Sequence, residues 1–124
     1  IGLIPDTACS WLVPQRLGQA RALGLAMTGN KLPAAKAAEW GLIWDAVAED
    51  VFADTVQQLA EQLATMPTKA LVRTRQAMQA GRTNTLEQQL TLEGLYMREL
   101  GRSSDYVEGV SAFLEKRPPR FTGA

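Results

Sequence analysis

Histidine is absent from this sequence of 124 residues, and cysteine occurs only once, at Cys9. These absences exclude His-based catalytic triads, zinc sites of the Cys/His type and a disulfide scaffold within the chain. We expect no metal site. Thirteen Lys and Arg residues balance thirteen Asp and Glu residues, which leaves a formal net charge of zero. Binding to nucleic acid through a global positive field is therefore not expected.

Long apolar runs are also missing, and none approaches the ~18–20 residues that span a bilayer. The first residues lack the basic region followed by an apolar one that marks a secretory signal peptide. We therefore expect a cytoplasmic protein with no membrane partner. The sequence begins with Ile1 instead of Met, and we expect it to be a piece of a longer chain.

Most of the sequence has apolar residues at intervals of three and four, which is the spacing of amphipathic helices. Phe52, Val56 and Leu59 show this pattern ahead of Pro67, and that helix is expected to end before the proline. Glycine and proline separate the remaining segments. The helices expected on this basis lie at 8–13, 19–27, 33–40, 52–66, 70–80, 86–100 and 106–114.

Residues 42–47 are the one segment predicted to form a strand, because they include β-branched and aromatic residues. One strand cannot form a sheet, so its ladder partners must lie in another chain or in a missing part of this one. The segment 86–100 is apolar over so wide an arc that we expect it to lie between two partners. These patterns predict a mainly α-helical fragment with one short strand and more apolar helix surface than it can cover alone.

Asp6 is the first candidate for a chemical role. It follows a short apolar entry, Ile1 to Pro5, and precedes a helix of small and apolar residues. Partial desolvation on such a turn would raise the pKa of its carboxyl group above about 3.9, and the carboxylate would accept protons better near neutral pH. The alternative is a helix cap, in which Asp6 or Thr7 accepts the first free helical N–H groups. Spacing alone favours the cap.

Two further candidates have simpler structural interpretations. Cys9 lies on the first turn of that helix, where the helix N-terminus lowers the pKa of a thiol. Because no histidine is present to activate it, a small core residue is the favoured interpretation. The basic cluster of Lys116, Arg117 and Arg120 follows a helix end, where it either pairs with the helix dipole or binds phosphate.

Several segments of this sequence together match a known family pattern. They are Gly2-Leu3-Ile4-Pro5-Asp6, Trp11-Leu12-Val13-Pro14, 21–26, 38–44, 64–68 and 104–117. On these segments the chain resembles the second half of the enoyl-CoA hydratase/isomerase (crotonase) family. The resemblance implies the C-terminal half of the α/β crotonase (ClpP/crotonase-like) fold, with 1–48 as the end of the core and 49–124 as a helical oligomerisation region. It also implies an oxyanion hole in the half that is missing here, so the chain alone is expected to be inactive.

In the isomerase group of this family, the Asp that matches Asp6 acts as the acid/base. The resemblance therefore implies that Asp6 removes the proton α to a thioester carbonyl. Details at 41–44, 53–60 and 84–86 resemble members of bacterial phenylacetate degradation, which convert ring-1,2-epoxyphenylacetyl-CoA to the oxepin form. A double-bond shift in an enoyl-CoA would need the same base. The residues expected to line the acyl pocket are Ile4, Trp11 and Leu12.

The sequence departs from the family pattern beside Asp6. Ala8-Cys9-Ser10 stands where the family commonly has Gly-Gly-Thr, so the acyl group that is accepted stays open. The turn also resembles that of 4-chlorobenzoyl-CoA dehalogenases, in which the matching Asp is a nucleophile. An enoyl-CoA hydratase is another alternative, although hydratases of the family usually have Gly at this position. Outside the family, a non-catalytic helical oligomerisation module would have the same apolar helices.

The resemblance also implies partners for the chain. The site that binds the adenine of coenzyme A in the family uses a Lys that matches Lys116, and an aromatic residue where this chain has Met97 beside Tyr96. No cofactor is expected beyond the coenzyme A thioester that serves as substrate. Because family subunits form trimers that commonly pair into hexamers, we expect a homotrimer or hexamer.

Overall fold

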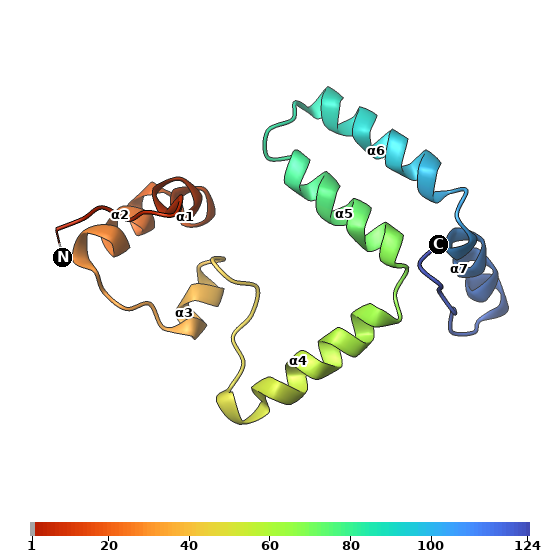
Figure 1. Ribbon diagram of the computed structural model, residues 1–124, viewed down its shortest axis with the longest axis horizontal. Coiled ribbons are helices and arrows are strands. Elements are labelled where there is room, and N and C mark those ends of the chain that lie inside the picture. Colours follow the sequence, from red (N-terminus) through yellow and green to blue (C-terminus); the bar gives the residue numbers. More distant parts are fainter. Residues whose placement is uncertain (1) are drawn as a thin grey trace. The chain divides into compact units, whose positions relative to one another are not determined.

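The computed structural model describes residues 2–124, so Ile1 of the apolar entry lies outside the described residues. Seven α-helices and their connections make up this part of the chain (Figure 1). They are α1 Cys9–Leu17, α2 Gln19–Thr28, α3 Ala34–Glu39, α4 Glu49–Ala64, α5 Thr68–Ala80, α6 Leu86–Leu100 and α7 Ser104–Glu115. The prediction of a mainly helical chain is confirmed, and each expected helix overlaps one of these seven.

The short strand predicted at 42–47 is wrong. These residues form bends and irregular backbone, with no strand assigned anywhere in residues 2–124. The N–H groups of Leu42 and Ile43 bond back to the carbonyl oxygen of Ala37 on α3, at 2.9 and 3.5 Å. A strand needs a neighbouring strand to satisfy its backbone groups, and the described segments supply none. β-propensity by itself therefore leaves this segment irregular.

Two compact units divide the chain, Ile1–Thr55 and Val56–Ala124, and each is described by itself. In the first unit α1 packs against α2, and Gly18, with a φ of 77°, makes the turn between them. The guanidinium of Arg21 on α2 lies 5.0 Å from the ring centre of Trp40 at the end of α3, which is a cation–π contact. The sequence predicted Pro33 as the first helical residue of α3. In the structure Pro33 is the N-cap residue, and the helix begins at Ala34.

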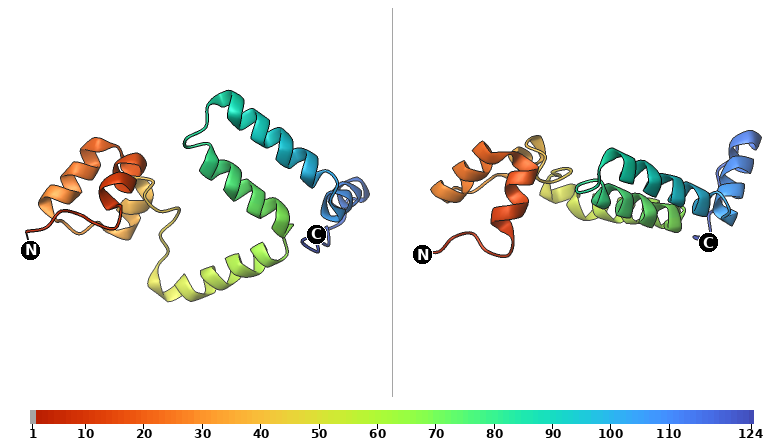
Figure 2. Two further views of the ribbon diagram at one scale, coloured as in Figure 1. Left: turned by 45° about the horizontal axis from the view of Figure 1, so that its top comes forward. Right: turned by 90° about the horizontal axis from the view of Figure 1, so that it is seen from above.

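In the second unit, α5 and α6 lie side by side as an antiparallel hairpin (Figures 1 and 2). An ion pair joins the two helices, with Arg73 Nη2 on α5 lying 2.8 Å from Glu99 Oε2 on α6. A capping box begins α6: the N–H of Gln88 donates to Thr85 Oγ1, and the N–H of Thr85 donates to Gln88 Oε1. The cap satisfies backbone groups that the helix itself cannot, and so fixes where α6 begins.

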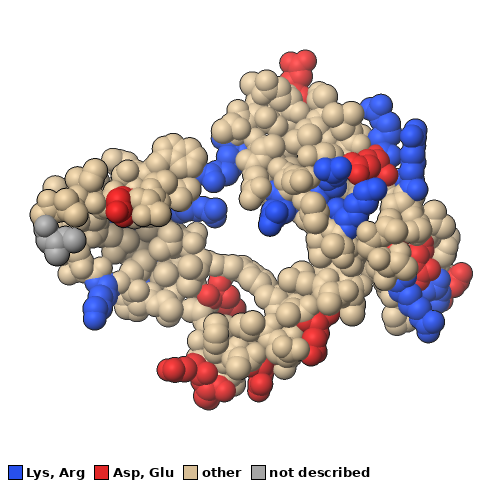
Figure 3. Space-filling view, in the orientation of Figure 1, with Lys and Arg blue, Asp and Glu red and all other residues tan. Residues whose placement is uncertain are grey.

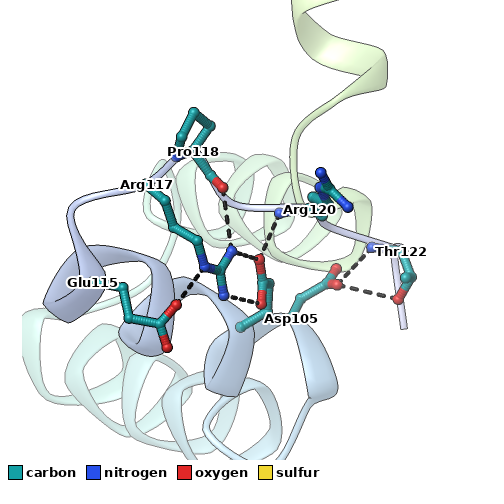
Figure 4. A network of polar contacts seen from close by, with 7 residues as sticks. Asp105, Glu115, Arg117, Pro118, Arg120 and Thr122 are labelled. Atoms are coloured by element: carbon teal, nitrogen blue, oxygen red, sulfur yellow. Dashed lines mark hydrogen bonds and ion pairs between the residues drawn. The ribbon is translucent and has the colours of Figure 1, made fainter.

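Buried polar contacts fix the C-terminal tail against α7. Asp105 on the first turn of α7 is only 5% exposed. Its carboxylate accepts hydrogen bonds from the N–H and the hydroxyl of Thr122, at 2.7 and 3.2 Å (Figure 4). It also accepts one from the N–H of Gly123, at 2.8 Å. Ser103 caps the same helix by accepting from the N–H of Tyr106 at 3.1 Å. One carboxylate therefore anchors the last residues of the chain.

The described residues enclose very little apolar interior. The buried hydrophobic residues are Leu17, Ala22, Ala37 and Ala112. Large apolar side chains stay exposed instead, such as Trp44, Leu86 and Phe113 at 85, 76 and 82%. None of the helices in residues 2–124 is both long and apolar enough to cross a membrane. Exposed apolar surface on this scale is typical of interaction surfaces, and the prediction of more apolar helix surface than the chain can cover is confirmed.

Candidate functional site

The turn at 6–8 places Asp6 immediately ahead of α1. Thr7 and Ala8 have φ angles of 54° and 62°, in the left-handed region that residues with a Cβ seldom adopt. The N–H of Cys9 donates to the Asp6 carbonyl at 2.8 Å, and the N–H of Leu12 donates to the Ala8 carbonyl at 2.9 Å. These bonds close the turn and start the helix. The backbone therefore determines the point at which the carboxylate of Asp6 leaves the chain.

The side-chain cap predicted for this helix is wrong. Ala8 is the N-cap residue of α1, and no side chain accepts a hydrogen bond there. Asp6 lies two residues upstream, and the left-handed backbone between keeps its side chain from the first free N–H groups. Its Oδ1 atom accepts a hydrogen bond of 3.0 Å from the hydroxyl of Thr7 instead. The carboxylate of Asp6 is therefore not used to cap the helix.

The side chain of Asp6 is exposed in this chain. The prediction of a sheltered, partly desolvated carboxylate is therefore wrong for the described residues. Desolvation needs other atoms packed over the group, yet Leu3 and Ile4 of the apolar entry are themselves each 81% exposed. Residues 2–124 hold no cluster of three or more His, Cys, Asp or Glu side chains that could bind a metal ion.

An apolar hollow of about 610 Å³ lies next to the turn, within the first unit. Ile4 and Pro5 line it from the apolar entry, Cys9 and Val13 from α1, and Leu25 from α2. Pro5, which immediately precedes Asp6 in the sequence, lines the hollow, whereas Asp6 itself does not. A concave apolar surface of this size is typical of sites that hold a small apolar group.

The hollow includes one of the three residues predicted for the acyl pocket. Ile4 lines it, whereas Trp11 and Leu12 lie outside its lining and are 57 and 37% exposed. Cys9, interpreted from the sequence as a core residue, is half-buried and faces the hollow. The sequence analysis missed Cys9 and Val13 as lining residues. Their spacing of four, which places them on one helix face, was the signal that could have found them.

At the other end of the chain, a network of ion pairs holds Arg117. Its Nη1 and Nη2 atoms donate to the two carboxylate oxygens of Glu108, at 2.6 and 3.0 Å, and its Nε donates to Glu115 at 2.6 Å. Acidic and basic side chains gather together over α7 and the segment after it (Figures 3 and 4). Hydrogen bonds from Arg117, and from the N–H of Arg120, lower the pKa of Glu108 to about 2. The guanidinium of Arg117 is therefore occupied by ion pairs with Glu108 and Glu115.

Lys116 differs from its neighbour Arg117. It ends α7 in the left-handed conformation, with a φ of 53°. Its side chain is exposed and makes no ion pair with any residue in 2–124. A second hollow, of about 650 Å³, lies in the same unit and is lined by Met97, Tyr106 and Phe113 among others, but not by Lys116. The structure thus leaves Lys116 accessible to an anion and does not bring it to the hollow that Met97 lines.

Comparison with known proteins shows the family to which the chain belongs. A family model for enoyl-CoA hydratase/isomerase matches residues 1–124. The chain is 56% identical over 123 residues to the 1,2-epoxyphenylacetyl-CoA isomerase of Escherichia coli (strain K12), a match that covers 99% of this chain and 47% of the relative. It is 40% identical over 114 residues to the cyclohexa-1,5-dienecarbonyl-CoA hydratase of Thauera aromatica, covering 89% of this chain and 43% of that one. The chain spans about half the length of the curated relatives it matches.

Solved structures agree with this assignment. An enoyl-CoA hydratase from Bacillus anthracis matches with a TM-score of 0.91 and 28% identity, over 99% of this chain and 48% of that one. An enoyl-CoA hydratase from Mycobacterium tuberculosis H37Rv matches with a TM-score of 0.88 and 30% identity. The match covers 99% of this chain and 49% of that one. These matches confirm the prediction that the chain has the fold of one half of a crotonase subunit. The chain belongs to the enoyl-CoA hydratase/isomerase family.

Proposed function

We propose that Asp6 is the acid/base of an acyl-CoA isomerase, in a protein that joins this chain to the other half of the family fold. The proposed reaction converts ring-1,2-epoxyphenylacetyl-CoA to the oxepin form. The observation that carries the proposal is the 56% identity to the E. coli 1,2-epoxyphenylacetyl-CoA isomerase over 99% of this chain. The turn supports it, since Asp6 lies on a hydrogen-bonded turn and the residues on either side of that turn, Pro5 and Cys9, line an apolar hollow.

The proposed chemistry divides the work between Asp6 and the other half of the fold. Asp6 removes the proton from the carbon next to the thioester carbonyl, and the electron pair moves onto the carbonyl oxygen to form an enolate. The N–H groups of an oxyanion hole in the other half stabilise that negative charge. The carbon–carbon bond shared by the epoxide and the six-membered ring breaks while both carbon–oxygen bonds are kept, which expands the ring to the oxepin. Asp6 returns the proton to a ring carbon, so no atoms are gained or lost.

The exposure of Asp6 in this chain bears on how the other half would act. A base that works near neutral pH gains from a carboxyl pKa above the ordinary value, and burial is the usual cause of such a rise. The first unit does not bury Asp6, and the neighbouring Leu3 and Ile4 are 81% exposed. We therefore propose that the other half covers the apolar entry and the turn, which excludes water from the carboxylate.

Coenzyme A binding and assembly are further parts of the proposal. Lys116 is proposed to bind the phosphate groups of coenzyme A, supported by its exposure and by its lack of an ion pair with the residues described. The thioester itself is the substrate, with no additional cofactor. We propose a homotrimer or hexamer assembled through 49–124, with 1–48 completing the core. The exposed Leu86 on α6 and Phe113 on α7 support such contacts.

An enoyl-CoA hydratase is the second candidate. The 40% identity to the cyclohexa-1,5-dienecarbonyl-CoA hydratase of Thauera aromatica favours it. Asp6 would then serve the addition of water to a double bond instead of epoxide isomerisation. Addition of water to an enoyl-CoA thioester, measured with the same protein and variants, separates the two activities. The dehalogenase-like role has no comparable observation in its favour.

The test is the variant Asp6→Asn in the protein that contains both halves of the fold. Asparagine keeps the size of the side chain but cannot accept a proton, so the rate of isomerisation of the epoxide thioester should fall more than tenfold, or ~1.4 kcal/mol. Asp54→Asn is the matched control, since Asp54 is an exposed carboxylate on α4 of the same unit. Retention of more than a tenth of the wild-type rate by Asp6→Asn would exclude the proposed role.

A further inference from the structure

Thr7 is held in a conformation that its own side chain disfavours. Its φ of 54° lies in the left-handed region, which is rare for residues with a branched Cβ. In this conformation its Oγ1 donates a hydrogen bond of 3.0 Å to Oδ1 of Asp6. We propose that Thr7 is a positioning residue for Asp6, an inference that rests on the proposed function.

The contacts of the carboxylate show what this hydrogen bond controls. Among residues 2–124, the side chain of Asp6 accepts no other hydrogen bond and makes no ion pair. Within the described residues no other contact restricts rotation of this carboxylate, so the hydroxyl of Thr7 is the group of this chain that orients it. The bond engages Oδ1 and leaves Oδ2 without a donor from the described residues. Oδ2 is then the oxygen that accepts the substrate proton.

A purely structural role for the hydroxyl does not fit the turn. No side chain caps α1, and the carbonyl oxygens of Asp6 and Ala8 accept the first N–H groups of the helix. The Thr7 hydroxyl is therefore not needed to begin the helix. Among the described residues, the hydrogen bond of this hydroxyl goes to the carboxylate of Asp6. Fixing a reacting group in a productive orientation raises the rate of a reaction without new contacts to the substrate.

The backbone of Thr7 provides a way to separate positioning from folding. Glycine adopts a positive φ at little cost, so Thr7→Gly relieves the strain of the turn while it removes the hydroxyl. Thr7→Val keeps the branched shape and also removes the hydroxyl. Thr7→Ser keeps the hydroxyl and removes the branch. The three variants thus change strain and hydrogen bonding in different combinations.

The experiment measures kcat and KM for the epoxide thioester with the protein that contains both halves of the fold. Positioning predicts that Thr7→Val and Thr7→Gly each lower kcat fivefold or more, with KM within twofold of wild type. It predicts that Thr7→Ser keeps kcat within twofold. The inference is overturned if Thr7→Gly retains more than half of the wild-type kcat, or if Thr7→Ser loses as much as Thr7→Val. Thermal unfolding identifies a misfolded variant, and the pair Thr7→Ser and Thr7→Gly decides the matter if Thr7→Val does not fold.

Failure of this inference is distinguishable from failure of the proposed function. If Asp6→Asn keeps the rate, the proposed function fails whatever the Thr7 variants do. If Asp6→Asn abolishes the rate while Thr7→Val leaves it unchanged, only the positioning role fails. In the Asp6→Asn background Thr7→Val should cause no further loss, because the hydroxyl then has no carboxylate to orient.

Discussion

Removal of the Asp105 carboxylate should release the C-terminal tail from α7. The side chain is 5% exposed and accepts three hydrogen bonds, two from Thr122 and one from the N–H of Gly123. A hydrogen bond to a charged group contributes roughly 1.5–3 kcal/mol, although donors freed from it can turn to water. For Asp105→Ala we therefore expect a loss of about 2–4 kcal/mol in the free energy that docks the tail.

Hydrogen exchange of the Thr122 and Gly123 amides measures this loss directly. Exchange should accelerate by about 30- to 700-fold in Asp105→Ala, since ~1.4 kcal/mol corresponds to a factor of ten. Asp105→Asn should have a smaller effect, because one oxygen still faces Thr122 while the amide group meets the donor of Gly123. Asp54→Ala, on the exposed surface of α4, is the control and should leave both amides protected. Unchanged protection in Asp105→Ala would refute the reasoning.

Two further predictions concern α7 and α6. Because hydrogen bonds from Arg117 lower the pKa of Glu108 from 4.5 to about 2, the stability from this pair is present above pH 4.5 and is lost as the pH falls to about 2. The temperature of unfolding should therefore decrease more steeply over this range for the wild type than for Glu108→Gln, and equal slopes would contradict the prediction. Thr85→Ala removes the acceptor for the N–H of Gln88 and should lower stability by about 1 kcal/mol, whereas Thr85→Ser should retain it. Denaturant unfolding checks this, and equal midpoints for both variants would argue against the cap.

The helices were predictable because their signals are local. Phe52, Val56 and Leu59 recur at helical spacing, and α4 at Glu49–Ala64 overlaps the helix expected at 52–66. The turn chemistry before α6 also lies within a few residues, with Thr85 followed three positions later by Gln88. Whether residues 42–47 form a strand could not be predicted from such local signals. Its formation depends on a second strand, and the described part of the chain contains none.

The candidate site was predictable in position but not in detail. The sequence indicated a turn at Pro5-Asp6 followed by a helix, and α1 does begin at Cys9. It did not indicate that Thr7 and Ala8 adopt left-handed backbone, because neither is a glycine. This conformation removed the predicted helix cap and gave the carboxylate a hydroxyl partner instead. The exposure of Asp6 was missed as well, because an apolar entry shelters a carboxylate only when it is itself covered.

The sequence by itself determined the helical class, the family resemblance and the placement of Asp6 on a turn, because each depends on residues close together along the chain. Only the tertiary structure decided which distant residues meet. Asp105 finds its partners at Thr122 and Gly123, and Ile4 joins Leu25 in the lining of one hollow. Such contacts depend on the path of the backbone between the partners, and no local pattern of spacing specifies that path.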